Sequence, residues 1–230
     1  QTLPTINVEA APLPANPAGV SVRKTRTQFA KQNIADSADV LRYFPNLQLR
    51  QRYIGDPNAI ISSRDAGTLQ SARSLVYADG LLLSNLMTNG WDGAPRWGMV
   101  SPQSIESVEV LYGPYSALYP GNSSGATVLI HTRLPDAFTA GADAQYFSQD
   151  FRDDYGAGGR YDGNRFAAYL GDHDGRWRWL LSVSRLDNQG QPMQYAVAKA
   201  GGDAGDAVPV SGATLDRNIN GKPRLIYGAN

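Results

Sequence analysis

The stretch IESVEVLYGPYSALYPGNSSGATVLIHTR, residues 105–133, limits the possible folds more than any other part of the sequence. Apolar and polar residues alternate in SVEVLY at 107–112, which predicts a strand, and ATVLIHT at 126–132 predicts another. Between them lie a Gly-Pro pair, a short helical turn and a reversal rich in Gly, Asn and Ser. Because a tight reversal needs backbone freedom, we expect positive φ at one or more of three glycines, Gly113, Gly121 and Gly125.

Upstream of this stretch, the sequence predicts a helix and two short strands. NIADSADVLRYFP at 33–45 has the apolar spacing of a helix, with Asn33 as the N-cap and Pro45 as the stop. Strands are expected at 47–51 and 59–64.

The next segment, SLVYADGLLL at 74–83, has Asp79-Gly80 between two apolar runs, which predicts a two-residue hairpin. Residues 84–99 lack periodicity and contain two tryptophans. Either both indoles fold back onto the core, or the segment is a binding loop, and both interpretations stay open. Ser101-Pro102 then predicts the start of one helical turn.

The composition argues against several kinds of site. Lys plus Arg and Asp plus Glu each number 21, so no net charge directs the chain toward nucleic acid. There is no cysteine for a disulfide, a thiolate metal site or a nucleophile, and the two histidines, His131 and His173, are isolated. No run approaches the roughly 18 apolar residues of a transmembrane helix. We therefore expect no catalytic activity, no cofactor and no resident metal.

The first 19 residues differ in texture from the rest. QTLPTINVEA at 1–10 is a short alternating segment, and APLPANPAG at 11–19 is a Pro-rich linker. A strand tethered in this way is either a disordered tail or a segment that pairs with the sheet edge of another protein. The chain starts at Gln1 without an initiator Met, which we interpret as a mature N-terminus after processing.

After Pro135 the sequence predicts long antiparallel strands. They are GADAQYFSQDF at 141–151, NRFAAYLGD at 164–172 and RWRWLLSVSR at 176–185, whose last member alternates large apolar with polar residues. Such strands suit a tilted transmembrane β-barrel, and a soluble antiparallel sheet would give the same alternation. Residues 187–224, rich in Gly, Asp, Asn and Pro, are expected to form one long loop.

In order and in content, these features resemble the plug domain of TonB-dependent outer-membrane receptors. ADVLRYFPNLQL (38–49) resembles the family's "LLR..PGV" helix end, IISSRDAG (60–67) its "IRG" strand and LVYADGLLL (75–83) its "V.VDG" hairpin. The stretch at 105–133 resembles the closing pattern "VEVLRGP.S.LYG....GG.INI.T". Four collinear motifs are a strong signal, and PTINVEA at 4–10 resembles the TonB box.

The resemblance implies an α+β plug domain with a small mixed β-sheet, followed by the first antiparallel strands of a transmembrane β-barrel. We expect a TonB box and Pro-rich linker at 1–19, the plug at 20–135, and the start of an outer-membrane β-barrel, including a long loop, at 136–230. The family barrel has 22 strands. Fewer than 100 residues follow the plug, so we interpret the sequence as a fragment of a longer chain.

By resemblance, the protein is a receptor and transporter in the lipid of the Gram-negative outer membrane, with a periplasmic N-terminus. It would take up a scarce ligand, most often a ferric siderophore, with energy from the protein TonB. TonB would bind the segment Thr5, Ile6, Asn7, Val8, Glu9 and Ala10. A soluble periplasmic ligand-binding or interaction module without transport is the alternative. An enzyme acting on carbohydrate is disfavoured, because the Asp residues concentrate in hairpin turns.

The resemblance also implies particular site residues. Arg64 corresponds to one of two family arginines that lock the plug to the barrel, and Tyr112 stands where the other would be. The family's ligand meets the plug at its extracellular apex, which corresponds here to loops 50–57 and 84–97. These loops contain the candidate ligand-binding residues Arg52, Tyr53, Met87, Asn89 and Trp91.

This set of side chains suits an anionic or aromatic chelate. The alternative is that Arg52 is merely solvated and Trp91 packs inward. No cluster of His, Asp, Glu or Tyr stands out that would bind iron itself, so a metal is expected to arrive already chelated.

Overall fold

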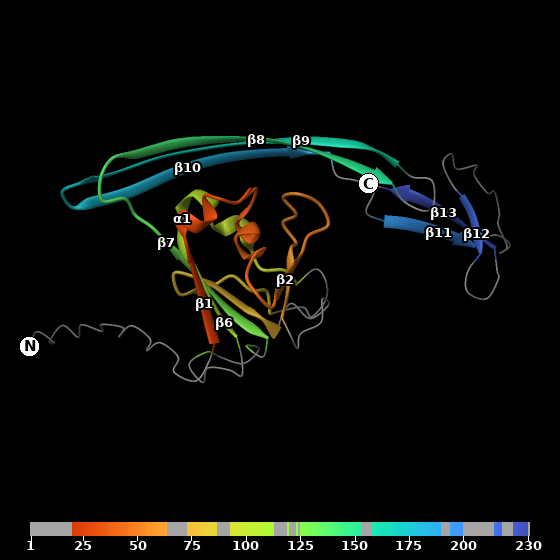
Figure 1. Ribbon diagram of the computed structural model, residues 1–230, viewed down its shortest axis with the longest axis horizontal. Helices are drawn as coiled ribbons and strands as arrows, with labels where there is room; N and C mark the ends of the chain where they lie inside the picture. Colours follow the sequence, from red (N-terminus) through yellow and green to blue (C-terminus); the bar gives the residue numbers. More distant parts are fainter. Residues whose placement is uncertain are drawn as a thin grey trace, which may run out of the picture.

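The computed structural model describes residues 20–63, 73–86, 93–112, 119, 123, 125–152, 158–189, 194–199, 214–217 and 223–229. The described residues between 20 and 133, here called the N-terminal unit, form a small mixed sheet with short helices. The next described strands form a long antiparallel layer, here called the strand layer, which lies along one side of that unit (Figure 1). In the part of the chain described, no helix is long and apolar enough to cross a membrane.

The sheet of the N-terminal unit has five strands in the order β1-β6-β7-β4-β5. The strands are β1 (Val20–Thr25), β4 (Leu75–Ala78), β5 (Leu81–Leu82), β6 (Ile105–Tyr112) and β7 (Ala126–Thr132). All neighbours are antiparallel except β4 and β7, which are parallel. The mixed sheet and the predicted strands at 107–112 and 126–132 are therefore confirmed.

The hairpin between β4 and β5 also forms as its sequence predicts. Asp79 and Gly80 have φ values of 46° and 82°, the left-handed pair that a two-residue turn requires. The Asp79 carboxylate accepts hydrogen bonds from the backbone N and the hydroxyl of Thr132, which ties the turn to the end of β7.

The expected helix at 33–45 is wrong in both extent and cap. The segment contains only a 3₁₀ helix, η1 (Ser37–Leu41), and its N-cap is Asp36. The Asp36 carboxylate accepts from the backbone N of Ala38 and Asp39, while Asp39 accepts from the N of Ala35 and Asp36. These reciprocal bonds hold Asp36 in an extended conformation, so the N-cap lies three residues after the predicted one.

The other short elements lie around this sheet. They are the helices α1 (Arg26–Phe29), η3 (Trp97–Met99) and η4 (Pro102–Ser104) and the paired strands β2 (Leu47–Arg50) and β3 (Ile60–Ser63). The helical turn predicted after Ser101 is η4. The core between these elements and the sheet is apolar and includes Phe29, Leu41, Trp97, Val108, Val110, Val128 and Ile130.

The positive φ expected from sequence is not found at Gly125. Its φ is not in the positive range, whereas Gly113 and Gly121 lie outside the described residues. A Cβ at Gly125 would lie 2.5 Å from Ser63 Oγ and 2.7 Å from Ser74 Oγ. Glycine is needed here because three chain segments approach closely, not because of left-handed backbone.

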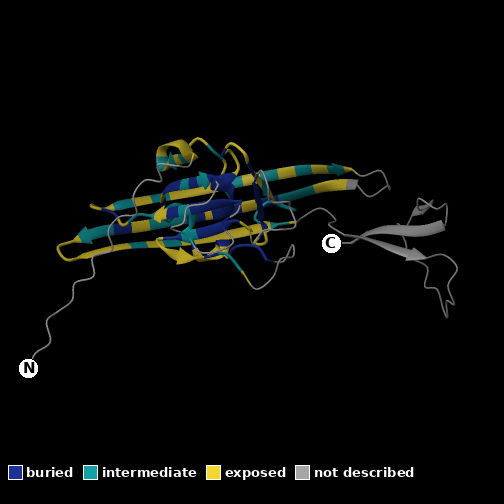
Figure 2. Cartoon of the chain, turned by 90° about the horizontal axis from the view of Figure 1, so that it is seen from below, coloured by how far each residue is buried: buried dark blue, intermediate teal, exposed yellow. Residues whose placement is uncertain are grey.

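The strand layer consists of β8 (Thr139–Arg152), β9 (Gly158–Asp174) and β10 (Trp177–Asn188) in the order β10-β9-β8. All three strands were predicted, and each is longer than its predicted segment. In Figure 1 they run above the N-terminal unit, with α1 between them and the sheet. In Figure 2 the buried residues gather at the centre of the molecule, and exposed residues alternate with less exposed ones along the long strands.

The prediction of one long loop at 187–224 is wrong. Strands β11 (Gln194–Lys199) and β12 (Thr214–Arg217) lie inside that range, and both pair with β13 (Pro223–Ala229). The segment QYAVAK at 194–199 does alternate polar and apolar residues, which is the strand signal. The prediction was based on the composition of the whole range, in which the neighbouring Gly- and Asp-rich residues outweigh this short segment.

Candidate functional site

The loop between β2 and β3 is built around a buried ion pair. The Asp56 side chain is 0% exposed and the Arg52 side chain 30% exposed. The Asp56 carboxylate accepts from Arg52 Nε (2.9 Å), Nη2 (2.8 Å) and backbone N (3.0 Å), and from Asn58 N (2.9 Å). Gly55, at a φ of 80°, provides the left-handed residue of this turn. The four bonds fix the shape of the loop.

The electrostatics of this pair favour both charges. Burial by itself would raise the pKa of Asp56, but the hydrogen bonds from Arg52 and Asn58 outweigh it and hold that pKa below its usual range. The hydrogen bond with Asp56 in turn raises the pKa of Arg52. The loop therefore keeps an ionised pair at neutral pH.

Two of the predicted ligand residues come together in this loop. The Arg52 guanidinium lies 5.8 Å from the centroid of the Tyr53 ring. Both residues line a cavity of about 380 Å³, together with Arg42, Leu49, Gln51, Ile54 and Gln149. Arg52 is not merely solvated, because two of its guanidinium nitrogens donate to the Asp56 carboxylate. These two nitrogens are therefore already occupied within the protein.

The far ends of the strand layer contact the same loop. Leu186 packs on Gly55 so closely that a Cβ there would lie 1.9 Å from Leu186 Cδ2. Asn188 Nδ2 donates to Ile54 O at 2.9 Å. Sequence reasoning missed Asp56, although its spacing of four from Arg52 was a usable signal. No local signal could have found Asn188, which is 134 residues from Ile54.

The second predicted loop is only partly described. Met87, Asn89 and Trp91 lie outside the described residues. Trp97, the other tryptophan of that segment, is 2% exposed, and its indole Nε1 donates to Ala59 O at 2.9 Å. This indole therefore packs into the core and is hydrogen-bonded to the residue that precedes β3.

The predicted energy-coupling and locking residues have different outcomes. The segment 5–10 and Arg64 lie outside the described residues. Tyr112 is buried, and its hydroxyl donates to Pro45 O within the N-terminal unit. At this position the chain therefore has a contact that stabilises the unit internally, where the family pattern has an arginine.

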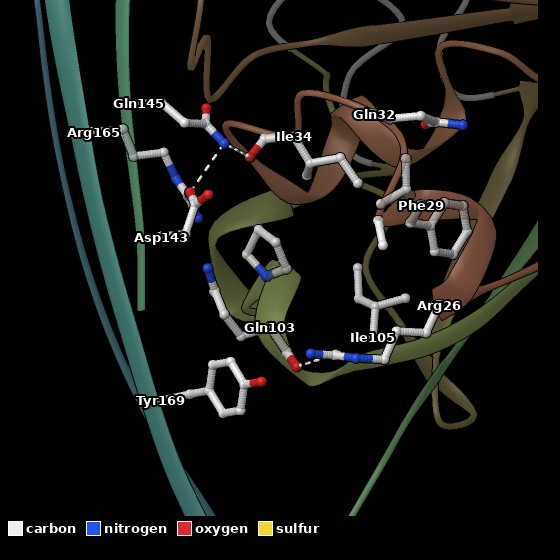
Figure 3. Close-up of a pocket in the computed structure, with 13 residues that line it drawn as sticks. Arg26, Phe29, Gln32, Ile34, Gln103, Ile105, Asp143, Gln145, Arg165 and Tyr169 are labelled. Atoms are coloured by element: carbon white, nitrogen blue, oxygen red, sulfur yellow. Dashed lines mark hydrogen bonds and ion pairs between the residues drawn. The ribbon is translucent and has the colours of Figure 1, made fainter. Parts of the chain in front are cut away.

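A second cavity, of about 220 Å³, lies between the N-terminal unit and the strand layer (Figure 3). On the strand side, Arg165 Nη1 contacts Asp143 Oδ1 at 2.5 Å, and the Arg165 side chain is 2% exposed. Gln145 Nε2 reaches across to Ile34 O at 3.1 Å. Among the described residues, no group of three His, Cys, Asp or Glu could hold a metal ion.

The chain was compared with models of protein families. The family model described as the TonB-dependent Receptor Plug Domain matches residues 13–127.

Two curated relatives are similar to part of the chain. A ferrioxamine B receptor of Salmonella typhimurium is 32% identical over 139 residues, which is 60% of this chain and 18% of that receptor. The vitamin B12 transporter BtuB of Vibrio vulnificus is 27% identical over 108 residues, 47% of this chain and 16% of the transporter. The chain thus spans less than a fifth of the length of either relative.

Solved structures share the fold. The unliganded ferric citrate transporter FecA has a TM-score of 0.60 at 20% identity, over 78% of this chain and 27% of the transporter. The siderophore receptor PirA of Acinetobacter baumannii has a TM-score of 0.54 at 21% identity, over 75% of this chain and 25% of the receptor.

Proposed function

Because this chain belongs to the TonB-dependent receptor plug-domain family, whose model matches residues 13–127, we propose that it forms the plug and the first barrel strands of a ligand-uptake receptor. Members of the family are receptors and transporters of the outer membrane with a periplasmic plug N-terminus, and this chain shares that location. The proposed ligand is a scarce nutrient, in the first place a ferric siderophore. The proposed source of energy is TonB.

The observation that carries this proposal is an apolar band on the outer face of the strand layer. The outward residues of β10 include Trp177, Leu181 and Val183, which are 78%, 68% and 63% exposed. On β9 the outward residues include the exposed side chains of Phe166 and Leu170. A soluble module would leave these groups in water, whereas a barrel strand places them in lipid. The band is why we prefer a membrane receptor over the soluble periplasmic module.

The band also supports an orientation for the chain. It lies near the two-residue turn between β9 and β10, and the strands continue beyond it through polar residues such as Asp150, Arg160 and Asp187. Outer-membrane barrels have short periplasmic turns and long extracellular loops. In this orientation the β2–β3 loop, which contacts Leu186 and Asn188, faces the extracellular side.

The strand layer has two open edges, on β8 and on β10, in the described part of the chain. Open edges are not viable in lipid, since each unpaired backbone group costs several kcal/mol there. We therefore assign residues 136–230 to the start of a barrel that continues into the 22 strands of the family. Residues 20–135 are the proposed plug, and residues 1–19 are the proposed TonB box and linker.

The proposed ligand-binding residues are Arg52 and Tyr53 from the first loop and Met87, Asn89 and Trp91 from the second. Arg52 and Tyr53 share the cavity of about 380 Å³, which supports a role for the first loop. In the R52A/W91A variant, we expect the affinity for ferrioxamine B, used as the probe, to fall about tenfold, which corresponds to roughly 1.4 kcal/mol. Unchanged affinity in a folded double variant would move the site to other loops.

The TonB segment is tested separately. Ile6→Pro removes a backbone donor from the proposed strand pairing and fixes φ. We expect this variant to bind the ferric chelate with parental affinity, and we expect cells that carry it to take up no chelate. Ile6→Val, which keeps the donor, is the matched control. Normal uptake by the proline variant would refute the assignment of the TonB box. The lock is tested by Arg64→Ala: if this variant does not weaken the attachment of the plug to the barrel, the role proposed for Arg64 is wrong.

A further inference from the structure

One aromatic side chain of the strand layer packs closely on a glycine of the neighbouring strand. Tyr169 is an inward-facing residue of β9, and it lies across Gly141 of the paired strand β8. A Cβ at Gly141 would lie 2.6 Å from Tyr169 Cε1. The glycine therefore leaves room for the ring against the backbone of β8, and Figure 3 shows the Tyr169 side chain projecting toward the N-terminal unit.

Two arginines of the N-terminal unit lie near this ring. The guanidinium carbon of Arg26 is 5.6 Å from the centroid of Tyr169, and that of Arg133 is 5.5 Å away. At this distance the ring quadrupole attracts the cations. Arg133 Nε and Nη2 are buried and have no hydrogen-bond partner among the described residues, so the Tyr169 ring gives this guanidinium a favourable electrostatic contact that hydrogen bonds at these two atoms do not supply.

The two arginines come from opposite ends of the unit. Arg26 directly follows β1, and its Nη1 donates to Gln103 O at 2.8 Å. Arg133 directly follows β7, and its backbone N donates to Ser104 O at 2.8 Å. The ends of β1 and β7 are thus both hydrogen-bonded to residues 103–104, and the arginine after each strand contacts the same Tyr169 ring. We call Arg26, Arg133 and Tyr169 the tyrosine clasp.

Arg26 of the clasp directly follows β1, the first strand that a force on the N-terminal tail would act on. β1 is an edge strand that pairs only with β6 within the described sheet, and its side chains are exposed or half-buried. Its pairing runs from Val20 with Tyr112 to Thr25 with Ser107. Force applied before Val20 would peel these pairs in order, because edge strands with little burial open at low cost. The next residue in that order is Arg26.

Next to the clasp there is room for such a movement. The cavity of about 220 Å³ is bordered by Arg26, Phe29 and Ala30 of the α1 region and by Tyr169 (Figure 3). α1 has only four residues, so few backbone hydrogen bonds hold it once β1 has separated.

We propose that Arg26, Arg133 and Tyr169 are positioning residues for uptake: the clasp holds the N-terminal segment of the plug against the barrel wall and sets how readily TonB releases it. This inference rests on the proposed function. The clasp is made of cation–π contacts, which lack the strict geometry of a carboxylate lock and can re-form after each cycle.

The test compares Tyr169→Leu with Tyr169→Phe in the complete receptor in detergent. Hydrogen exchange of residues 20–30 should become about fivefold faster in Y169L, because the cation–π contacts are lost, and stay within about twofold in Y169F. Tyr161→Leu is the matched control, since Tyr161 is on the same strand and its ring contacts Phe151 instead. Exchange in the strand layer should be unchanged in all three variants.

A second readout is uptake of ferrioxamine B by cells. Y169L should bind the chelate as the parent does and reach a higher maximal uptake rate, whereas Y169F should match the parent. Equal exchange of 20–30 in Y169L and the parent, or a Y169F variant that behaves like Y169L, would overturn the clasp. A lower or unchanged maximal rate would overturn its role in release. Because exchange is measured without ligand or TonB, it tests the clasp even if the parent transports nothing.

Discussion

The Arg52–Asp56 pair offers the sharpest test of what the β2–β3 loop does. In Arg52→Ala the Asp56 carboxylate, 0% exposed, keeps only the backbone donors of residue 52 and Asn58. Removing one partner of a buried ion pair typically costs about 3–5 kcal/mol. Because Arg52 is 30% exposed, we expect the lower end, about 3 kcal/mol of unfolding free energy.

The reciprocal change should cost less. Asp56→Asn removes the charge and keeps an oxygen for only one of the two backbone donors, because Arg52 N and Asn58 N bind different carboxylate oxygens. We expect a loss of about 2 kcal/mol, within the range for hydrogen bonds to charged groups. The double variant should lose about 3 kcal/mol rather than the sum, because the two residues act on the same interaction. The pKa of Asp56 is lowered on folding, so the stability it provides is present above its unfolded pKa and is lost as pH falls through the folded pKa. D56N should lack that loss in acid.

The assay is urea denaturation in detergent, followed by tryptophan fluorescence. Trp97 is a suitable reporter because its indole is buried and bonded to Ala59 O in the folded state and becomes exposed on unfolding. Ferrioxamine B affinity is measured on the same variants. If Arg52 acts by shaping the loop, R52A and D56N weaken binding together. If it also contacts the ligand, R52A weakens binding more. An unfolding free energy within about 0.5 kcal/mol of the parent in R52A would refute the structural role.

Two further changes test the packing and the titration of the plug. Gly125→Ala should cost about 1–3 kcal/mol by overpacking against Ser63 and Ser74, and removing both hydroxyls in the same chain should recover most of it in a denaturation series. If stability is not recovered, close approach is the wrong reason for the glycine. Burial and the Asp39 carboxylate raise the pKa of Asp36 to about 6, so the stability it provides is complete below its unfolded pKa and is lost as pH rises through 6. Asp36→Asn should flatten the melting temperature between about pH 4 and 6, and parallel curves for parent and variant would contradict the assignment.

The sequence by itself determined the elements whose signals are local. Strand alternation at 107–112 and 126–132 and the Asp79-Gly80 turn fixed the centre of the sheet, because residue period and turn chemistry depend on neighbours in the chain. The same period revealed the three long strands of the strand layer. The motif order was enough to indicate the family before any contact was known.

Tertiary structure decided what depends on distant residues. VSVRKT at 20–25 has only two apolar residues, so its sequence alone gives a weak strand signal, and it becomes β1 because the edge of β6 pairs with six of its residues. Arg52 was predicted as a ligand group, and its buried partner Asp56 gives it a structural role that the sequence did not indicate. The tyrosine clasp joins residues 26, 133 and 169, and no sequence period links them. Side-chain contacts across such separations follow from the packing of whole elements, so local patterns contain no record of them.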